Sequence, residues 1–112
     1  MIISVIGLGY IGLPTAAVLA YRGIDIIGVD VQQDVVDIIN QGKIHIVEPG
    51  LESLVHSSVR AGKFRATVKA EKADVFLVAV PTPFIDDHKP DLTYIHSSIK
   101  SIAKVLEKGN LI

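Results

Sequence analysis

The sequence predicts an α/β fold, a doubly wound parallel sheet with helices on both faces, and three observations support this prediction. Short runs of Ile and Val alternate along the chain with segments of helical composition, as in successive βαβ units. Hydrophobic residues make up 49% of the chain and aromatic residues only 5%, which suits strands buried on both faces. The chain has 112 residues, the size of one ordinary domain.

The first half of the chain predicts two strands, each followed by a helix. Residues 2–6 form a short apolar run, and residues 11–21 are rich in Ala and Leu, with Gly23 as a helix stop. Residues 25–30 form a second apolar strand. Residues 32–40 carry Val and Ile at helical spacing, so we expect a second helix there.

The middle of the chain predicts another helix and two more strands. A loop over residues 44–50 leads into a helix over 51–60, and a short strand follows over 64–68. Residues 75–80 are wholly apolar and form the clearest strand in the sequence. This strand ends at Pro81, because proline cannot donate a hydrogen bond to a sheet.

The last third predicts a loop, a helix and the beginning of a strand. Residues 84–90 have the composition of a polar loop, and Asp91 or Thr93 is suited to cap a helix that runs to about Leu106. Residues 110–112 then begin a fifth strand. We therefore expect a sheet that is truncated at the start of this strand, in a chain that is a fragment.

Three glycines in one turn predict a binding site for a dinucleotide. Gly7, Gly9 and Gly12 follow the first strand directly and open the first helix, which is the context that a G-x-G-x-x-G motif requires. Gly7 allows a tight turn, Gly9 allows the backbone to approach a pyrophosphate, and Gly12 allows close packing of helix and strand. The N–H groups and dipole of the helix start favour the anion. The fold is therefore predicted to be of the Rossmann type.

Asp30 predicts that the dinucleotide is NAD. It ends the second strand, 18 residues after Gly12, and the motif expects an acidic residue at about this distance. Its carboxylate can accept hydrogen bonds from the adenosine ribose and would repel the 2′-phosphate of NADP. No Lys or Arg stands at residues 31–34 to bind that phosphate. Two alternatives are FAD, whose proteins share the motif, and a vestigial or different nucleotide site.

Other polar segments carry weaker signals. Thr82 follows the fourth strand, where it can contact the nicotinamide ribose or the pyrophosphate. The alternative is that residues 81–83 only end the strand with two prolines. Glu48 belongs to a turn that enters a helix. The four histidines share no ligand spacing, and the acidic cluster at residues 86–88 is expected to be solvated, so no metal site is predicted.

Composition and charge exclude several classes of protein. The formal net charge is −1 with no basic stripe, so we expect no nucleic-acid partner. The chain contains no cysteine and therefore no disulfide or thiolate metal site. Residues 1–6 lack the basic start of a signal peptide, and no apolar run is long enough to span a membrane. We expect a cytoplasmic protein without a membrane partner.

The combined motifs resemble the nucleotide-sugar 6-dehydrogenases, the UDP-glucose/GDP-mannose dehydrogenase family, over essentially all 112 residues. The stretches that carry this resemblance are residues 5–14, 28–30, 46–51 and 79–83. Within the family, residues 13–17, 44–49 and 87–94 are most similar to members that oxidise UDP-N-acetyl-D-mannosamine.

The resemblance implies oxidation of a sugar C6 alcohol to a carboxylate, with two NAD reduced, in an enzyme of cell-surface polysaccharide biosynthesis. It assigns cofactor contacts to Tyr10, Ile11, Asp30 and Thr82, besides the glycines of the turn. It also implies a catalytic cysteine, a linking helix and a UDP-binding domain, which residues 1–112 do not supply, and a full-length homodimer. UDP-glucose or UDP-N-acetylglucosamine as substrate, and a non-catalytic NAD-binding module, are the alternatives.

Overall fold

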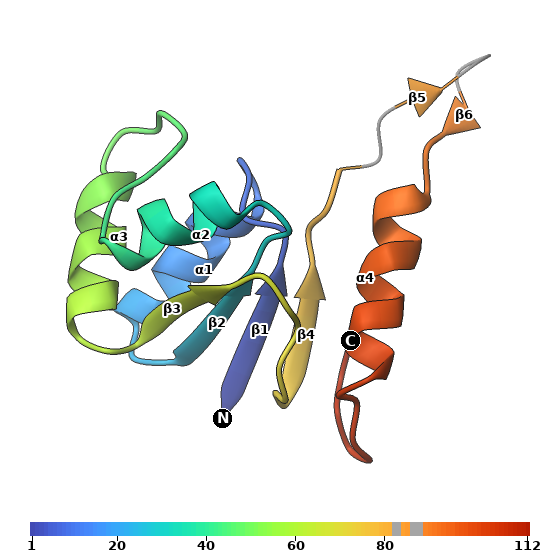
Figure 1. Cartoon of the computed structure of the whole chain (residues 1–112). Helices are drawn as coiled ribbons and strands as arrows, with labels where there is room; N and C mark the ends of the chain where they lie inside the picture. The colour runs from blue at the N-terminus through green and yellow to red at the C-terminus, as the bar shows by residue number, and fades with distance from the viewer. Residues whose placement is uncertain (82–83, 86–88) are drawn as a thin grey trace.

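The computed structural model describes residues 1–81, 84–85 and 89–112, and it contains a four-stranded parallel sheet (Figure 1). The strands of this sheet are β1 (Ile2–Ile6), β2 (Asp25–Val29), β3 (Phe64–Thr67) and β4 (Val75–Val78). The helices are α1 (Gly12–Tyr21), α2 (Gln33–Asn40), α3 (Leu51–Arg60) and α4 (Thr93–Ala103). Two short strands, β5 (Phe84–Ile85) and β6 (Lys89–Pro90), pair outside this sheet.

In the strand order β3-β2-β1-β4, the direction in which successive strands are added to the sheet reverses at β1. The chain adds β2 and β3 on one side of β1 and then crosses over to add β4 on the other side. In the register, Ile3 of β1 lies opposite Ile26 of β2 and Val75 of β4. In open α/β sheets, ligands bind beyond the carboxyl ends of the strands at such a switch point. A ligand site is therefore expected at the carboxyl ends of β1 and β4.

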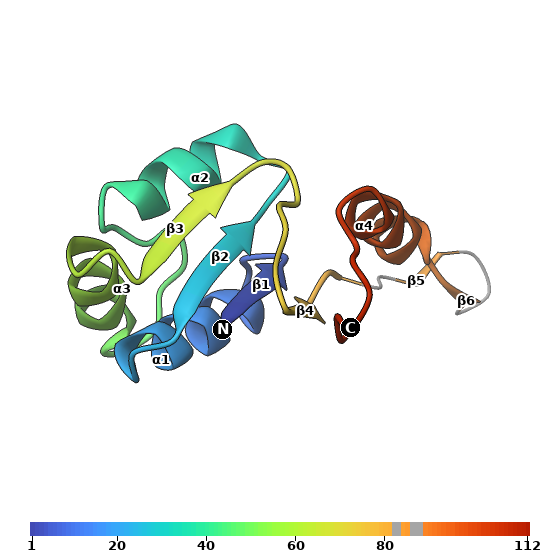
Figure 2. The same cartoon turned by 90° about the horizontal axis from the view of Figure 1, so that it is seen from below.

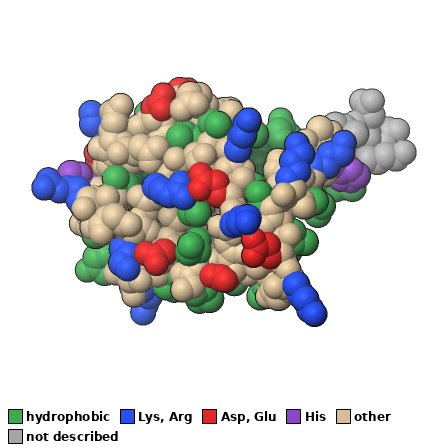
Figure 3. Space-filling view, turned by 60° about the horizontal axis from the view of Figure 1, so that its bottom comes forward, with side chains coloured by type: hydrophobic (Ala, Val, Ile, Leu, Met, Phe, Trp, Pro, Cys, Tyr) green, Lys and Arg blue, Asp and Glu red, His purple; other side chains and the backbone are tan. Residues whose placement is uncertain are grey.

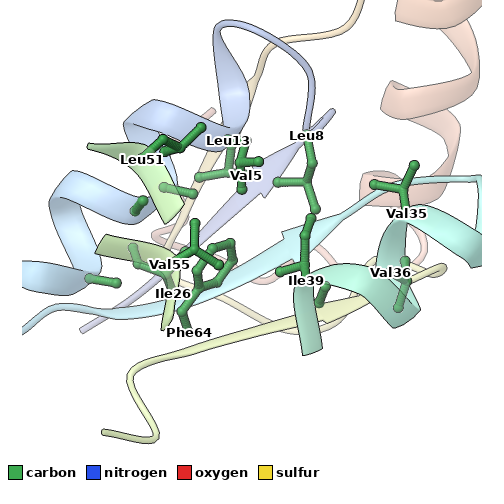
Figure 4. Close-up of a cluster of buried hydrophobic side chains, with 14 of the residues drawn as sticks. Val5, Leu8, Leu13, Ile26, Val35, Val36, Ile39, Leu51, Val55 and Phe64 are labelled. Carbon is green, nitrogen blue, oxygen red and sulfur yellow. The ribbon is translucent and has the colours of Figure 1, made fainter. Parts of the chain in front are cut away.

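Each face of the sheet has its own hydrophobic core, because successive strand residues point to opposite sides. Val5, Ile26 and Phe64 belong to a core with side chains from α1, α2 and α3, part of which Figure 4 shows. Phe76 belongs to a second core together with Ile102 of α4. Figures 1 and 2 show α4 apart from the other helices and next to β4. Helices therefore cover both faces, which confirms the doubly wound fold.

The predicted elements of the main sheet are present, with small shifts at their ends. β4 ends at Val78, before the predicted limit of residue 80, and α4 ends at Ala103, before the predicted limit of Leu106. Beyond α4, the N–H of Val105 bonds to the carbonyl of Ile102 at 2.9 Å, so the chain turns there. Leu111 forms a parallel bridge with Val75, which is the beginning of the predicted fifth strand.

The prediction of a polar loop over residues 84–90 is wrong for the residues that the structure describes. Phe84–Ile85 and Lys89–Pro90 pair as the antiparallel strands β5 and β6. The prediction gave weight to the polar residues of the segment, although aromatic and β-branched residues such as Phe84 and Ile85 favour strands. The acidic cluster at residues 86–88, which the sequence analysis expected to be solvated, lies outside the described residues.

Asn40, the last residue of α2, covers part of the outer edge of β3. Its Nδ2 donates to the carbonyl of Ala66 at 3.0 Å, and its Oδ1 accepts from the N–H of Ala66 at 2.8 Å. The carbonyls of Lys63 and Thr67 bond to β2, so the intervening Ala66 turns its own N–H and carbonyl away from the sheet. The side-chain amide thus takes the position of a neighbouring strand at an edge that would otherwise expose unpaired groups.

We expect Asn40→Ala to lower the free energy of unfolding by about 2 kcal/mol, because it removes two part-buried hydrogen bonds and leaves both backbone groups of Ala66 unpaired. Urea unfolding followed by circular dichroism measures this change. Gln33→Ala is the matched control, since Gln33 makes an exposed side-chain bond on the same helix. Equal stability of the two variants would contradict a role for Asn40 at the sheet edge.

The surface carries charges of both signs. Figure 3 shows acidic and basic side chains intermingled on one face of the molecule, in keeping with a net charge of −1. Arg65 binds Glu71 through two hydrogen bonds, and these lower the pKa of the Glu71 carboxyl from its ordinary value. Within the described part of the chain, no helix has both the length and the apolar character needed to cross a membrane.

Candidate cofactor-binding site

The turn between β1 and α1 approaches β2 and β4 closely at its first glycine. Gly7 has a φ of +96° and donates its N–H to the carbonyl of Val29 at 2.7 Å. A Cβ at this position would lie 2.6 Å from the carbonyl oxygen of Ala79. Both the left-handed conformation and the close approach require glycine. The tight turn predicted at Gly7 is therefore present.

The second and third glycines of the turn have opposite surroundings. A Cβ at Gly9 would meet nothing within 4 Å, so the backbone here borders open space. A Cβ at Gly12 would collide with the carbonyl oxygen of Gly7 and would lie 3.4 Å from the Cβ of Ala79. Gly12 therefore lets the start of α1 pack against the turn itself, more than against a strand as the sequence analysis expected. Gly9 leaves a backbone surface that a ligand can approach.

The start of α1 presents unneutralised backbone dipoles to the same space. Among the described residues, no side chain caps this helix and no acidic residue stands in its first turn. The N–H of Leu13 bonds to the carbonyl of Gly9 at 3.0 Å, so the helical hydrogen bonds begin directly behind the turn. A helix N-terminus of this kind favours the binding of an anionic group, such as a pyrophosphate, close to its free N–H groups.

Asp30 links the glycine turn to the end of β2. Its Oδ2 accepts a hydrogen bond from the N–H of Leu8 at 3.1 Å, and its Oδ1 accepts one from the N–H of Gln32 at 3.0 Å. Both carboxylate oxygens are therefore fixed by backbone donors, and each retains lone pairs for a further donor. The sequence analysis located Asp30 near a ribose, but it did not foresee that this carboxylate also orients the turn.

A cleft of about 540 Å³ lies beyond the carboxyl ends of β1, β2 and β4 and reaches the side of α4. Its walls come from the turn, the ends of these strands, the loop before α3 and α4, and they are mostly apolar. Residues that line it include Gly7, Leu8, Gly9, Tyr10, Ile11, Asp30, Val31, Gln32, Val35, His45, Val80, Tyr94, Ser97 and Ser101. The cleft occupies the switch point of the sheet, where ligands of such folds bind.

The structure brings most of the predicted cofactor residues together at this cleft. Gly7, Gly9 and Asp30 line it, and so do Tyr10 and Ile11, which are 69% and 73% exposed. Gly12 lies outside the lining and shapes the turn from behind. Thr82, the remaining predicted contact, lies outside the described residues.

The sequence analysis missed several residues of the cleft. Tyr94, Ser97 and Ser101 come from one side of α4, and His45 comes from the loop between α2 and α3. The i, i+4 spacing of Ser97 and Ser101 was available as a signal that they share a helix face. His45 carried no such signal, because the path of its loop depends on tertiary packing.

A second hollow, of about 480 Å³, adjoins the cleft at the loop before α3. It is formed by residues 44–50 together with Glu52 and Ser53, and His45 lines both spaces. The Glu48 turn does enter α3, with Gly50 in the left-handed conformation at φ +79°. Within the described residues, no group of His, Asp and Glu side chains is arranged to hold a metal ion.

The residues present fit a dinucleotide, and two observations of the structure carry this fit. The open space at Gly9, next to the start of α1, suits a pyrophosphate, and the fixed carboxylate of Asp30 suits the hydroxyl groups of a ribose. The strand order, the glycine turn and the cleft at the switch point together define a dinucleotide-binding domain of the Rossmann type.

Comparison with known proteins narrows this class. The family model of the UDP-glucose/GDP-mannose dehydrogenase family, NAD binding domain, matches residues 1–112. A UDP-N-acetyl-D-mannosamine dehydrogenase of Campylobacter jejuni is 62% identical over 98% of this chain and 27% of its own length. An NDP-N-acetyl-D-galactosaminuronic acid dehydrogenase of Ralstonia solanacearum is 60% identical over 98% of this chain and 26% of its own length. The chain thus spans about a quarter of the length of these relatives.

Solved structures agree with the sequence relatives. The UDP-N-acetyl-mannosamine dehydrogenase Cap5O from Staphylococcus aureus has a TM-score of 0.95 and 39% identity, over 99% of this chain and 28% of that one. A GDP-mannose dehydrogenase from Pseudomonas aeruginosa, solved as a ternary complex, has a TM-score of 0.91 and 38% identity, over 96% of this chain and 26% of that one.

The chain belongs to the UDP-glucose/GDP-mannose dehydrogenase family and corresponds to its NAD-binding domain. This confirms the resemblance stated from the glycine turn and the other motifs. It also confirms NAD as the cofactor, in preference to the FAD alternative. The contacts of individual side chains with NAD remain a prediction.

Proposed function

We propose that residues 1–112 form the NAD-binding domain of a longer nucleotide-sugar 6-dehydrogenase that oxidises UDP-N-acetyl-D-mannosamine to the uronic acid. The proposal that the chain binds NAD rests on the carboxylate of Asp30, which is fixed beside the glycine turn at the rim of the cleft. The substrate part is supported by the relative from Campylobacter jejuni, at 62% identity, whose name includes UDP-N-acetyl-D-mannosamine.

In this proposal the chain holds NAD and does not itself act on the sugar. The backbone at Gly9 and the start of α1 bind the pyrophosphate, while Asp30 accepts hydrogen bonds from the adenosine ribose. Tyr10 and Ile11 cover the cofactor at the rim of the cleft. Thr82, as the family resemblance implies, contacts the nicotinamide ribose or the pyrophosphate. When bound, NAD supplies the hydride acceptor for two successive oxidations of the C6 alcohol.

The remaining parts of the reaction belong to the longer protein in this proposal. A linking helix, a UDP-binding domain and a catalytic cysteine follow residue 112, as the family resemblance implies. The whole protein acts as a cytoplasmic homodimer in cell-surface polysaccharide biosynthesis. The small share of each relative that this chain spans supports such a division between cofactor binding and substrate binding.

A second substrate class has a specific observation in its favour. The relative from Ralstonia solanacearum is 60% identical and its name refers to an N-acetyl-D-galactosaminuronic acid, so two sugar classes lie at nearly the same distance. UDP-glucose and UDP-N-acetylglucosamine are the other candidates within the family. A non-catalytic NAD-binding module is the candidate from a different class.

Calorimetric titration of the 112-residue chain with NAD tests the proposal, and we expect saturable binding with one site per chain. Incubation with NAD and UDP-N-acetyl-D-mannosamine should produce no NADH absorbance at 340 nm, because the chain contains no cysteine. The positive control is the protein encoded by the uninterrupted reading frame, which should reduce two NAD per sugar. Turnover by the short chain, or no turnover by the long one, would contradict the proposal.

A further inference from the structure

The loop between α2 and α3 directs one side chain into the cofactor cleft. Ile46 is buried at 8% exposure, and Ile44 packs against the same hydrophobic core. His45 stands between them and lines the cleft, whereas Val47, the next residue after Ile46, is 91% exposed. The two isoleucines therefore anchor the loop and hold His45 against the cleft.

One nitrogen of the His45 ring is enclosed by the protein and has no partner. Nδ1 is buried and makes no hydrogen bond with any described residue. An unpaired buried lone pair is tolerated better than an unpaired buried N–H. A ring with its proton on Nε2 and none on Nδ1 therefore suits this environment. Since Nδ1 is enclosed while the ring lines the cleft, Nε2 is the nitrogen that can donate to a ligand.

Besides His45, the side-chain donors among the described residues of the cleft lining are hydroxyl and amide groups, such as those of Ser97 and Gln32. The described residues of the lining include no Lys or Arg. Asp30 offers acceptors only, and its oxygens already bind the N–H groups of Leu8 and Gln32. Its neighbour Ile46 belongs to the same hydrophobic core as Leu8 and Val35, so His45 lines the cleft on the side of Asp30, where the adenylate half of a dinucleotide would bind.

We propose that His45 donates a hydrogen bond from Nε2 to an oxygen of the adenylate half of NAD, on the ribose or on the adjacent phosphate. This inference rests on the proposed function, because it requires NAD in the cleft. It assigns a binding role to a residue of the loop before α3, outside the glycine turn and the strand ends. The loop then acts as a third wall of the cofactor site, and its isoleucine anchors position the donor.

The test compares ligand affinity in His45→Phe and His45→Gln, measured by calorimetry with NAD, ADP and nicotinamide mononucleotide. Loss of one hydrogen bond to a charged or sugar oxygen predicts about tenfold weaker binding of NAD and ADP by His45→Phe. Binding of nicotinamide mononucleotide should not change, and His45→Gln, which keeps a donor, should recover part of the affinity. His56→Gln is the matched control, because His56 is an exposed histidine of α3 outside the cleft.

A second measurement on the unmodified chain does not depend on the variants folding. Long-range proton–nitrogen NMR spectra report the ring nitrogens of His45, and we expect Nε2 to be protonated and to shift when NAD or ADP is added. Unchanged NAD affinity in a folded His45→Phe variant, or an unshifted ring, would overturn this inference alone. If the unmodified folded chain binds no NAD at all, the proposed function fails as well.

Discussion

Asp30→Ala is expected to weaken NAD binding about a hundredfold, which corresponds to about 2.7 kcal/mol at room temperature. The carboxylate is fixed at the cleft by the N–H groups of Leu8 and Gln32, so it meets the ribose without further ordering. Its removal takes away the acceptors for the ribose and also frees the N–H of Leu8 in the turn. We therefore expect a loss of stability of about 1 kcal/mol as well.

Calorimetry with NAD and NADP, together with thermal unfolding, measures both effects. Asp34→Ala is the matched control, because Asp34 lies in the first turn of α2, outside the cleft lining. Asp30→Ala should also narrow the preference for NAD over NADP, since the charge that repels the 2′-phosphate is removed. If Asp30→Ala binds NAD as tightly as the unmodified chain does, Asp30 is only a structural link between β2 and the turn.

The sequence was sufficient for the main sheet and its helices because the signals for these elements are local. The apolar run at residues 75–80, the glycines of the turn and the helical stripe at residues 32–40 each specify an element without reference to distant contacts. The order of these elements then favours a parallel sheet, because a helix between two strands returns the chain to the same end, as between β1 and β2 and between β2 and β3. The structure agrees, with four parallel strands in the order β3-β2-β1-β4.

Part of the site was also predictable, for the same reason. Gly7, Gly9 and Asp30 belong to a motif with a characteristic spacing, in which the end of the second strand lies beside the glycine turn. Their detailed relations were not predictable. The hydrogen bond from Leu8 to Asp30 depends on the register of β1 and β2, in which Ile6 lies opposite Val29. The collision of a Gly12 side chain with the carbonyl of Gly7 depends on the path of the turn.

The other walls of the cleft could not be predicted because they depend on tertiary packing. His45 reaches the cleft only because Ile44 and Ile46 pack into the core under α1, α2 and α3. Ser97 and Ser101 reach it because Ile102 fixes the rotation of α4 against the other face of the sheet. Spacing places Ser97 and Ser101 on one helix face but does not tell which surface that face meets. That depends, for the helix as for the loop, on which side of the segment finds apolar partners.

We expect Gly12 of the turn to be needed mainly for stability and Gly9 mainly for NAD binding, and two variants test this difference. Gly12→Ala brings a methyl group against the carbonyl oxygen of Gly7, so α1 or the turn must move. We expect this variant to lose about 3 kcal/mol or more of unfolding free energy. Gly9→Ala meets no atom within 4 Å, so its stability should change by less than about 1 kcal/mol.

The Gly9→Ala variant, whose stability should change little, should show a clear loss of NAD affinity. The methyl group of Gly9→Ala projects into the space assigned to the pyrophosphate, so NAD affinity should fall by at least about tenfold in a fully folded protein. Chemical unfolding and NAD titration of both variants measure the two quantities separately. A Gly9→Ala variant that binds NAD normally would mean that the pyrophosphate binds elsewhere in the cleft. A Gly12→Ala variant with unchanged stability would contradict the expected clash. It would mean that α1 and the turn can move apart and accommodate the methyl group without disturbing the core.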